Sequence, residues 1–198
     1  MDRNQAEEDL KAIRKIMEQS TRYTDFSGLS GIIAGFLALI GCAATIWIAW
    51  NSIWWSQRNA YVMIWVSVLV LAVAENAYFA NRKAKRNGDK LFNPASIQVI
   101  KSVIPGIVIA SVLSIKALIL NEWEAIPSLW TLGYGVSACA AGMFSVSEVK
   151  IFGIIQLITG ALGLFFIATW VDSMFLMALS FGIYHLLFGF LLGRKYGW

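Results

Sequence analysis

Charged residues are scarce in this sequence. Asp, Glu, Lys and Arg make up 14% of its 198 residues, against about 25% in a typical soluble domain, whereas hydrophobic residues make up 58%. This composition argues against a soluble globular domain. A membrane-spanning helix uses about 20 mostly apolar residues, so the chain has room for several spans joined by short loops. We expect one integral membrane domain and no second folded domain.

Residues that bind metals or form disulfides are also few. The single histidine, His185, excludes an HExxH zinc site and a bis-histidine haem. The two cysteines, Cys42 and Cys139, lie within apolar runs, which is typical of small buried side chains and not of a disulfide or metal framework. Neither a GxSxG elbow nor a glycine-rich phosphate loop occurs. We therefore predict no metal, no cofactor and no enzymatic activity.

Six apolar runs follow one another along the chain. Their approximate bounds are 27–50, 60–80, 97–120, 125–146, 151–170 and 173–192. Backbone groups in hydrocarbon must be hydrogen-bonded within the segment, and strands of a membrane barrel would be only about 10 residues long. The runs therefore predict helices. The expected fold is all-α and polytopic, with six transmembrane helices forming a bundle over residues 27–198.

Basic residues indicate how this bundle is oriented. Nearly all of the 16 Lys and Arg residues lie before the first run, between the second and third runs, or at other run ends on that same side. Arg58 lies in a loop on the opposite side, where most tryptophans gather as in an interfacial aromatic belt. By the positive-inside rule, both termini are expected in the cytoplasm.

Residues 1–26 are expected to form a separate cytoplasmic segment. They lack the apolar core and cleavage site of a signal peptide. Acidic residues precede basic ones over 1–20, which suits a helix dipole, and Leu10, Ile13 and Met17 share one face. This amphipathic helix either rests on the bundle and the lipid bilayer or docks a cytoplasmic partner. The basic stretch 82–90 is interpreted as a topology signal near anionic lipid, without nucleic-acid binding.

Small residues recur at four-residue spacing in the first and last runs. Such residues let helix backbones approach closely in a membrane, where lipid provides little hydrophobic drive for association. The pattern therefore predicts helix packing, either within this bundle or against a second copy or another membrane subunit. The candidate packing residues are Ser27, Gly31, Ala34, Gly35, Ala38, Gly189 and Gly193.

Polar residues of four runs are expected at one depth near the cytoplasmic side. A helix rises about 1.5 Å per residue, which places Glu75 and Asn76 of the second run level with Lys101 of the third. Glu75 and Lys101 are expected to pair, because an isolated charge within a span costs about 3 kcal/mol. Gln156 and His185 reach this layer from the last two runs. The layer is either interhelical hydrogen bonding or a pocket open to the cytoplasm.

Pro105 and Gly106 lie next to this layer. Because proline has no N–H, the carbonyl of Lys101 loses its helical partner and the third helix is expected to kink there. The two residues are therefore the candidate hinge of the pocket.

The first run also carries a resemblance. The stretch from Ser20 to Gly41, STRYTDFSGLSGIIAGFLALIG, resembles a family of small bacterial multi-pass membrane proteins without an assigned activity. The resemblance implies a location in the bacterial inner membrane. In size and helix count the chain is also similar to the substrate-binding subunits of vitamin-uptake transporters. The first helix of those subunits has small residues at four-residue spacing, here Ser30, Ala34 and Ala38.

Two functions remain open from the sequence. The first is a non-enzymatic accessory, sensory or regulatory membrane protein that assembles through its small-residue helix faces. The alternative is a small-solute transporter, or a substrate-binding transporter subunit, that uses the polar layer as an inner-leaflet pocket. The first is favoured because a transport pathway needs polar groups through the whole membrane, and the outer halves of the runs are nearly apolar.

Overall fold

Helices make up nearly all of the structure, which is a computed structural model that describes residues 23–24, 26–51, 54–88, 90–167 and 169–198. Over these ranges no β-strand occurs, and Tyr23 and Ser145 form an isolated parallel bridge. The predicted helix over 1–20 lies outside the described residues. The helices are α2 (Gly28–Asn51), α3 (Trp54–Arg86), α4 (Pro94–Leu120), η1 (Trp123–Ala125), α5 (Ile126–Ala141), α6 (Ser147–Phe166), α7 (Trp170–Met177), η2 (Ala178–Ile183) and α8 (Tyr184–Tyr196).

Each predicted apolar run corresponds to a helix or to a continuous set of helices. In the described ranges, five helical stretches are long and apolar enough to cross a membrane: α2, residues 59–86 of α3, α4, α6, and the rod formed by α7, η2 and α8. The fourth run corresponds to η1 and α5, and α5 has 16 residues. The all-helical fold is confirmed, and its apolar helices are consistent with a membrane location.

The ends of α4 show how the local sequence sets a helix boundary. Asn93 precedes Pro94, which tolerates the first helical position because no N–H is needed there. The Asn93 side chain accepts a hydrogen bond from the Ser96 N–H at 2.8 Å, and the Ser96 hydroxyl accepts one from the Asn93 N–H at 2.9 Å. At the other end, Asn121 adopts the left-handed conformation with φ of 61°. This conformation ends the helix.

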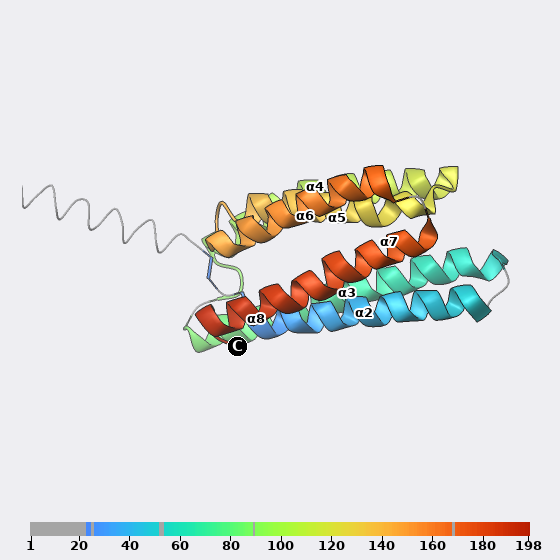
Figure 1. Ribbon diagram of the computed structural model, residues 1–198. Helices are drawn as coiled ribbons and strands as arrows, with labels where there is room; N and C mark the ends of the chain where they lie inside the picture. Colours follow the sequence, from blue (N-terminus) through green and yellow to red (C-terminus); the bar gives the residue numbers. More distant parts are fainter. Residues whose placement is uncertain (1–22, 25, 52–53, 89, 168) are drawn as a thin grey trace, which may run out of the picture.

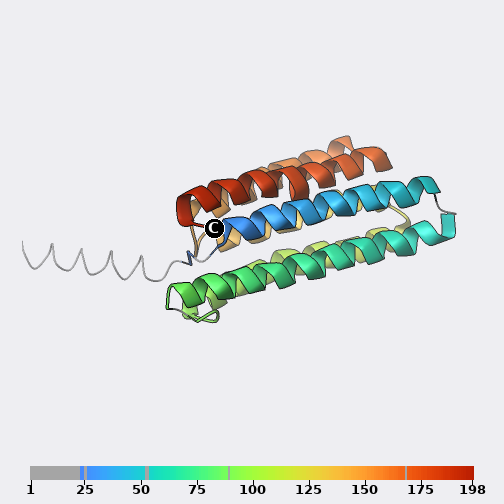
Figure 2. The same cartoon turned by 90° about the horizontal axis from the view of Figure 1, so that it is seen from below.

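The helices form two layers (Figure 1). In one layer, α5 packs between α4 and α6, and we name these three helices the α5 unit. In the other layer, α2 packs between α3 and the rod of α7, η2 and α8, which together form the α2 unit (Figure 2). Within each unit the central helix contacts both neighbours closely, whereas the units meet mainly where α7 packs on α5.

Glycines bring α2 and α8 into backbone contact. A Cβ atom added to Gly31 would lie 2.7 Å from the Cα atom of Gly189, and one added to Gly189 would lie 2.7 Å from the Gly28 carbonyl oxygen. One added to Gly35 would lie 2.9 Å from the Gly182 carbonyl oxygen. No side chain fits at these distances. The glycine face of α2 is therefore covered by η2 and α8 of the same chain, and Ser27 and Ala38 are buried as well.

The central helix α5 uses small residues on two sides. A Cβ atom on Gly133 would lie 2.6 Å from the Gly106 carbonyl oxygen of α4. A Cβ atom on Gly135 would lie 2.7 Å from the Leu157 amide nitrogen of α6. These close approaches explain why α5 lies between its two neighbours without large side chains separating them.

Two apolar clusters form the core between the layers. One contains Val99, Ala138, Phe152 and Leu192 from four helices, and the other contains Tyr61, Ala117, Ile126 and Met174. Along α5, buried Ser128, Thr131 and Ser137 lie between members of these two clusters, and along the rod of α7, η2 and α8 buried Ser180 and His185 do so. The core therefore encloses a polar section at intermediate depth.

Candidate functional site

The last rod changes its hydrogen-bonding pattern at η2, a π-helical turn over Ala178–Ile183. Such turns are rare and recur at functional sites, because the wider turn redirects backbone groups. Here the carbonyl oxygen of Ser180 accepts a hydrogen bond from Gln156 Nε2 at 2.9 Å and lies 3.2 Å from His185 Nδ1. One backbone carbonyl therefore joins α6 to α8.

The contacts of His185 fix its tautomer. A carbonyl oxygen can only accept, so Nδ1 of His185 is the nitrogen that donates to Ser180. In the neutral ring Nε2 is then an acceptor, and it receives the hydroxyl proton of Tyr134 at 3.1 Å. Tyr134 belongs to α5, so the bond between His185 and Tyr134 crosses between the two units, as the bond between Gln156 and Ser180 does.

These residues form a continuous cluster that we call the polar seam: Thr131, Tyr134, Gln156, Ser180 and His185. The hydroxyl oxygens of Thr131 and Ser180 lie 3.1 Å apart. Thr131, Gln156 and Ser180 are 0% exposed, and His185 is 8% exposed. Three of the members come from the α5 unit and two from the α2 unit, so the polar seam hydrogen-bonds one unit to the other.

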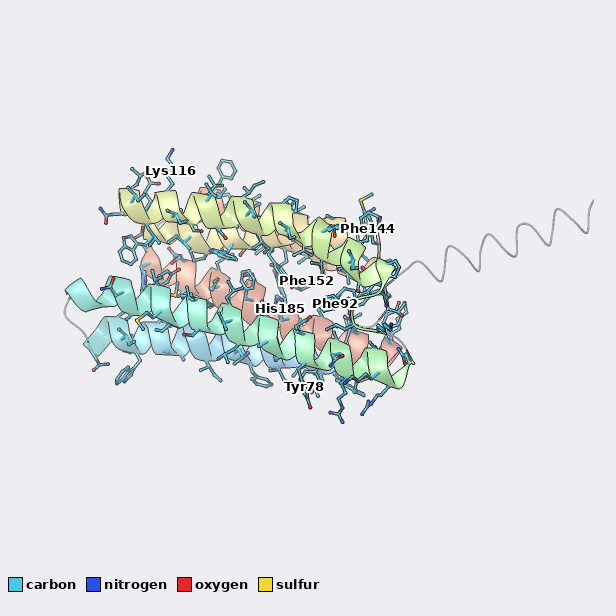
Figure 3. The ribbon with its side chains drawn as sticks, turned by 180° about the vertical axis from the view of Figure 1, so that it is seen from behind. Tyr78, Phe92, Lys116, Phe144, Phe152 and His185 are labelled. Atoms are coloured by element: carbon cyan, nitrogen blue, oxygen red, sulfur yellow. The ribbon has the colours of Figure 1, made fainter. Side chains whose placement is uncertain are left out.

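Aromatic rings surround His185. Its ring stacks on Phe181 at a centroid distance of 5.7 Å, and it forms a T-shaped pair with Phe152 at 5.0 Å. The ring centroid of Tyr134 is 5.3 Å away. Figure 3 shows the His185 and Phe152 side chains facing each other between the two layers. The imidazole is therefore held on its nitrogens by hydrogen bonds and on its faces by apolar rings.

One polar atom of the seam has no hydrogen bond among the described residues. Gln156 Oε1 is buried and without a partner, as is the hydroxyl of Ser128 on α5. An unsatisfied buried acceptor costs about 1–3 kcal/mol, so such an atom in a native protein usually meets a water, an ion or a ligand. This amide oxygen is the atom of the seam most suited to bind something else.

Glu75 and Asn76 form a second cluster with Ser30 inside the α2 unit. The Ser30 hydroxyl donates to Glu75 Oε1 at 3.0 Å, and Asn76 Nδ2 donates to the Ser30 oxygen at 3.0 Å. Glu75 Oε2 is buried and has no hydrogen bond within the described part of the chain. The structure therefore divides the predicted polar layer into this cluster, between α2 and α3, and the polar seam, which contains Gln156 and His185.

Lys101 belongs to neither cluster. Its side chain is exposed on α4, and over the described ranges no ion pair links it to Glu75. The reason is which helices are neighbours. Helix α4 packs on α5 and not on α3, so equal depth does not bring the two charges together. The expected pair of Glu75 and Lys101 is absent.

The candidate hinge lies in an uninterrupted helix. Helix α4 continues through Pro105 from Pro94 to Leu120. Gly106 faces α5, where an added Cβ atom would meet the Gly133 backbone and the Ser137 side chain. The Ser137 hydroxyl donates to the carbonyl of Val103 at 2.8 Å. In this structure the Pro105 region is thus a packing contact between α4 and α5.

The site residues predicted from the sequence do not include Thr131, Tyr134 and Ser180, and Ser30 is predicted there only as a small packing residue. All four are polar residues within apolar runs. That is the available signal, but serine and threonine are common in membrane helices as packing residues. The π-helical turn that directs the Ser180 carbonyl toward Gln156 has no sequence pattern that we recognise.

Comparison of the chain with protein-family models, with curated proteins and with solved structures gives no match.

Proposed function

We propose that the chain is a non-enzymatic accessory, sensory or regulatory protein of the bacterial inner membrane. In this proposal it has six transmembrane helices, and both termini face the cytoplasm. Besides the five long helical stretches, α5 is the remaining span. Its 16 residues reach about 24 Å, and η1 extends it at its start. The basic residues at one end of the bundle and the resemblance of Ser20–Gly41 to bacterial multi-pass proteins support this placement.

The observation that supports this function best is the internal hydrogen bonding of the polar seam. Its side chains are directed at each other and at the Ser180 carbonyl, and rings pack on His185. Two cavities of about 210 and 300 Å³ lie elsewhere, at the end of α3 and on the apolar surface between α2 and α3. The seam is thus suited to set how the two units pack. In this proposal the segment 1–26, with its predicted amphipathic helix, contacts a cytoplasmic partner.

Site-specific photocrosslinking in cells tests this proposal. A photoreactive amino acid replaces Leu10 on the apolar face of the predicted N-terminal helix, and in a matched control it replaces Val70, which is 60% exposed on α3. We expect a discrete protein adduct from position 10 and none of the same mass from position 70. Adducts of the same pattern at both positions, or protein adducts at neither, would contradict a partner at residues 1–26.

A transporter or substrate-binding subunit is the second candidate, because two buried oxygens of the predicted polar layer lack partners within the described ranges. Gln156 Oε1 lies between the two units and Glu75 Oε2 lies within the α2 unit. Transporters commonly bind solutes between two helix units that move against each other. The thermal stability of the purified chain with water-soluble vitamins and amino acids tests this candidate. A stabilising compound should lose its effect in Gln156→Leu and keep it in Gln98→Leu, whose side chain is exposed on α4.

A further inference from the structure

A basic cavity lies where α3 leaves the apolar part of the bundle. Its volume is about 210 Å³, and its lining includes Leu29, Phe79, Arg82, Arg86 and Trp198. Arg82 and Arg86 are four residues apart and therefore lie on one face of α3, one turn from each other. The cavity thus has two guanidinium groups beside aromatic and aliphatic side chains, and none of the described residues that line it is acidic.

Lys83 differs from the two arginines, although it lines the same cavity. Its ammonium group donates to the carbonyl oxygen of Phe26 at 2.7 Å and to that of Tyr196 at 2.9 Å. It thereby connects α3 to the residues before α2 and to the end of α8. Arg82 and Arg86 are exposed, and within the described ranges neither has a hydrogen bond or an ion pair. Their charges are therefore available to a ligand.

The cavity also marks a change of polarity along α3. Before it, the face of α3 that carries Arg82 is apolar: Leu71, about three turns earlier on that face, is 53% exposed and lines the apolar cavity between α2 and α3. After it, α3 ends with Lys85 and Arg86. A molecule that fits this surface has an apolar part lying along α3 and an anionic part next to the arginines. Trp198, an aromatic residue typical of membrane interfaces, lines the same cavity.

We propose that this cavity binds the phosphate of an anionic phospholipid, with Arg82 and Arg86 as the ligands of the phosphate. Arginine suits this role because its planar guanidinium group donates two parallel hydrogen bonds to phosphate oxygens. Basic pockets between membrane helices are a recognised means of binding anionic headgroups. The proposal rests on the membrane location of α3 and is independent of the accessory function, so either can fail alone.

Lipid binding to the purified full-length chain tests the proposal. Native mass spectrometry and thermal unfolding would compare added phosphatidylglycerol, phosphatidylcholine and inorganic phosphate. We expect phosphatidylglycerol to bind and to raise the melting temperature above that with phosphatidylcholine. The variant Arg82→Gln/Arg86→Gln should bind phosphatidylglycerol about 25-fold more weakly, since each basic residue contributes about fivefold near an anionic headgroup.

The matched control is Lys85→Gln/Lys90→Gln, which removes the same charge from two exposed lysines outside the cavity. It should retain nearly wild-type binding. Equal weakening in both variants would mean general attraction to the basic end of α3 and would overturn the site. Stabilisation by inorganic phosphate equal to that by phosphatidylglycerol would overturn the assignment to a lipid. If the double variant unfolds, the single variants Arg82→Gln and Arg86→Gln apply the same test, each with about fivefold weaker binding expected.

Discussion

Gln156 on α6 and His185 on α8 donate to the same acceptor, the backbone carbonyl oxygen of Ser180, at 2.9 and 3.2 Å. A regular α-helical carbonyl is already bonded to the amide four residues later. In the π-helical turn at Ala178–Ile183 this backbone bonding shifts to the amide five residues later, and the Ser180 carbonyl also accepts from these two side chains. One carbonyl of this turn therefore links the α2 unit to the α5 unit.

Gln156→Glu should destabilise the protein. An ionised carboxylate only accepts and would face the Ser180 carbonyl as a second acceptor, and a carboxyl that donates to this carbonyl must first take up a proton at a cost in free energy. The expected loss is about 1–3 kcal/mol, measured by reversible unfolding in detergent micelles. Gln98→Glu on the exposed face of α4 is the control and should change stability by less than about 0.5 kcal/mol. A similar loss in both variants would contradict a specific role for the Ser180 bond.

The bond between His185 Nε2 and the Tyr134 hydroxyl predicts energetic coupling across the two units. A double-mutant cycle of Tyr134→Phe and His185→Leu isolates that coupling. Hydrogen bonds between membrane helices average about 0.6 kcal/mol and reach about 1.7 kcal/mol, so we expect a coupling within this range. Strictly additive losses would mean that the two residues do not interact in the membrane.

The sequence predicts the depth of a residue in the bundle better than it predicts which helices lie side by side. The helical rise locates a residue along its helix to within about a turn. The apolar runs of the sequence agree closely with α2 and α4, whereas the run 151–170 is displaced by about one turn from α6. The neighbours of a helix cannot be predicted from its apolar pattern, because in a membrane helix both the lipid-facing and the core-facing sides are apolar. For that reason Glu75 and Lys101 were expected to pair across α3 and α4, two helices that pack on other partners.

Lys101→Met should therefore be nearly neutral, changing the free energy of unfolding by less than about 0.5 kcal/mol. Glu75 interacts with Ser30 at 3.0 Å instead, so Ser30→Ala should cost more than Lys101→Met, close to the average of about 0.6 kcal/mol for membrane hydrogen bonds. Unfolding measurements on the single variants and on Lys101→Met/Glu75→Gln check this. If Glu75→Gln restores stability lost in Lys101→Met, the two charges do interact and the arrangement of α3 and α4 is different.

The small-residue stripe shows a related limit. The four-residue spacing of small residues in α2 and near the end of the chain can be recognised in the sequence. However, such a stripe has the same sequence whether it packs on a helix of its own chain or on a helix of another chain. The structure brings Gly31 to Gly189, so α8 occupies the face that a second copy would use. Any assembly with another chain must then use other surfaces, such as the exposed apolar side of α3.

Gly31→Val distinguishes the two uses of the stripe. A Cβ atom at this position would lie 2.7 Å from the Gly189 Cα atom, so α2 and α8 must separate, and overpacking of this kind costs about 1–3 kcal/mol. Ala43→Val, on an exposed position of α2, should leave stability unchanged. Thermal unfolding measures the loss, and light scattering in detergent measures the oligomeric state. We expect Gly31→Val to lower the melting temperature with the same mass per particle as the parent chain. A variant that keeps its melting temperature but dissociates from a dimer to a monomer would show that the stripe packs between chains.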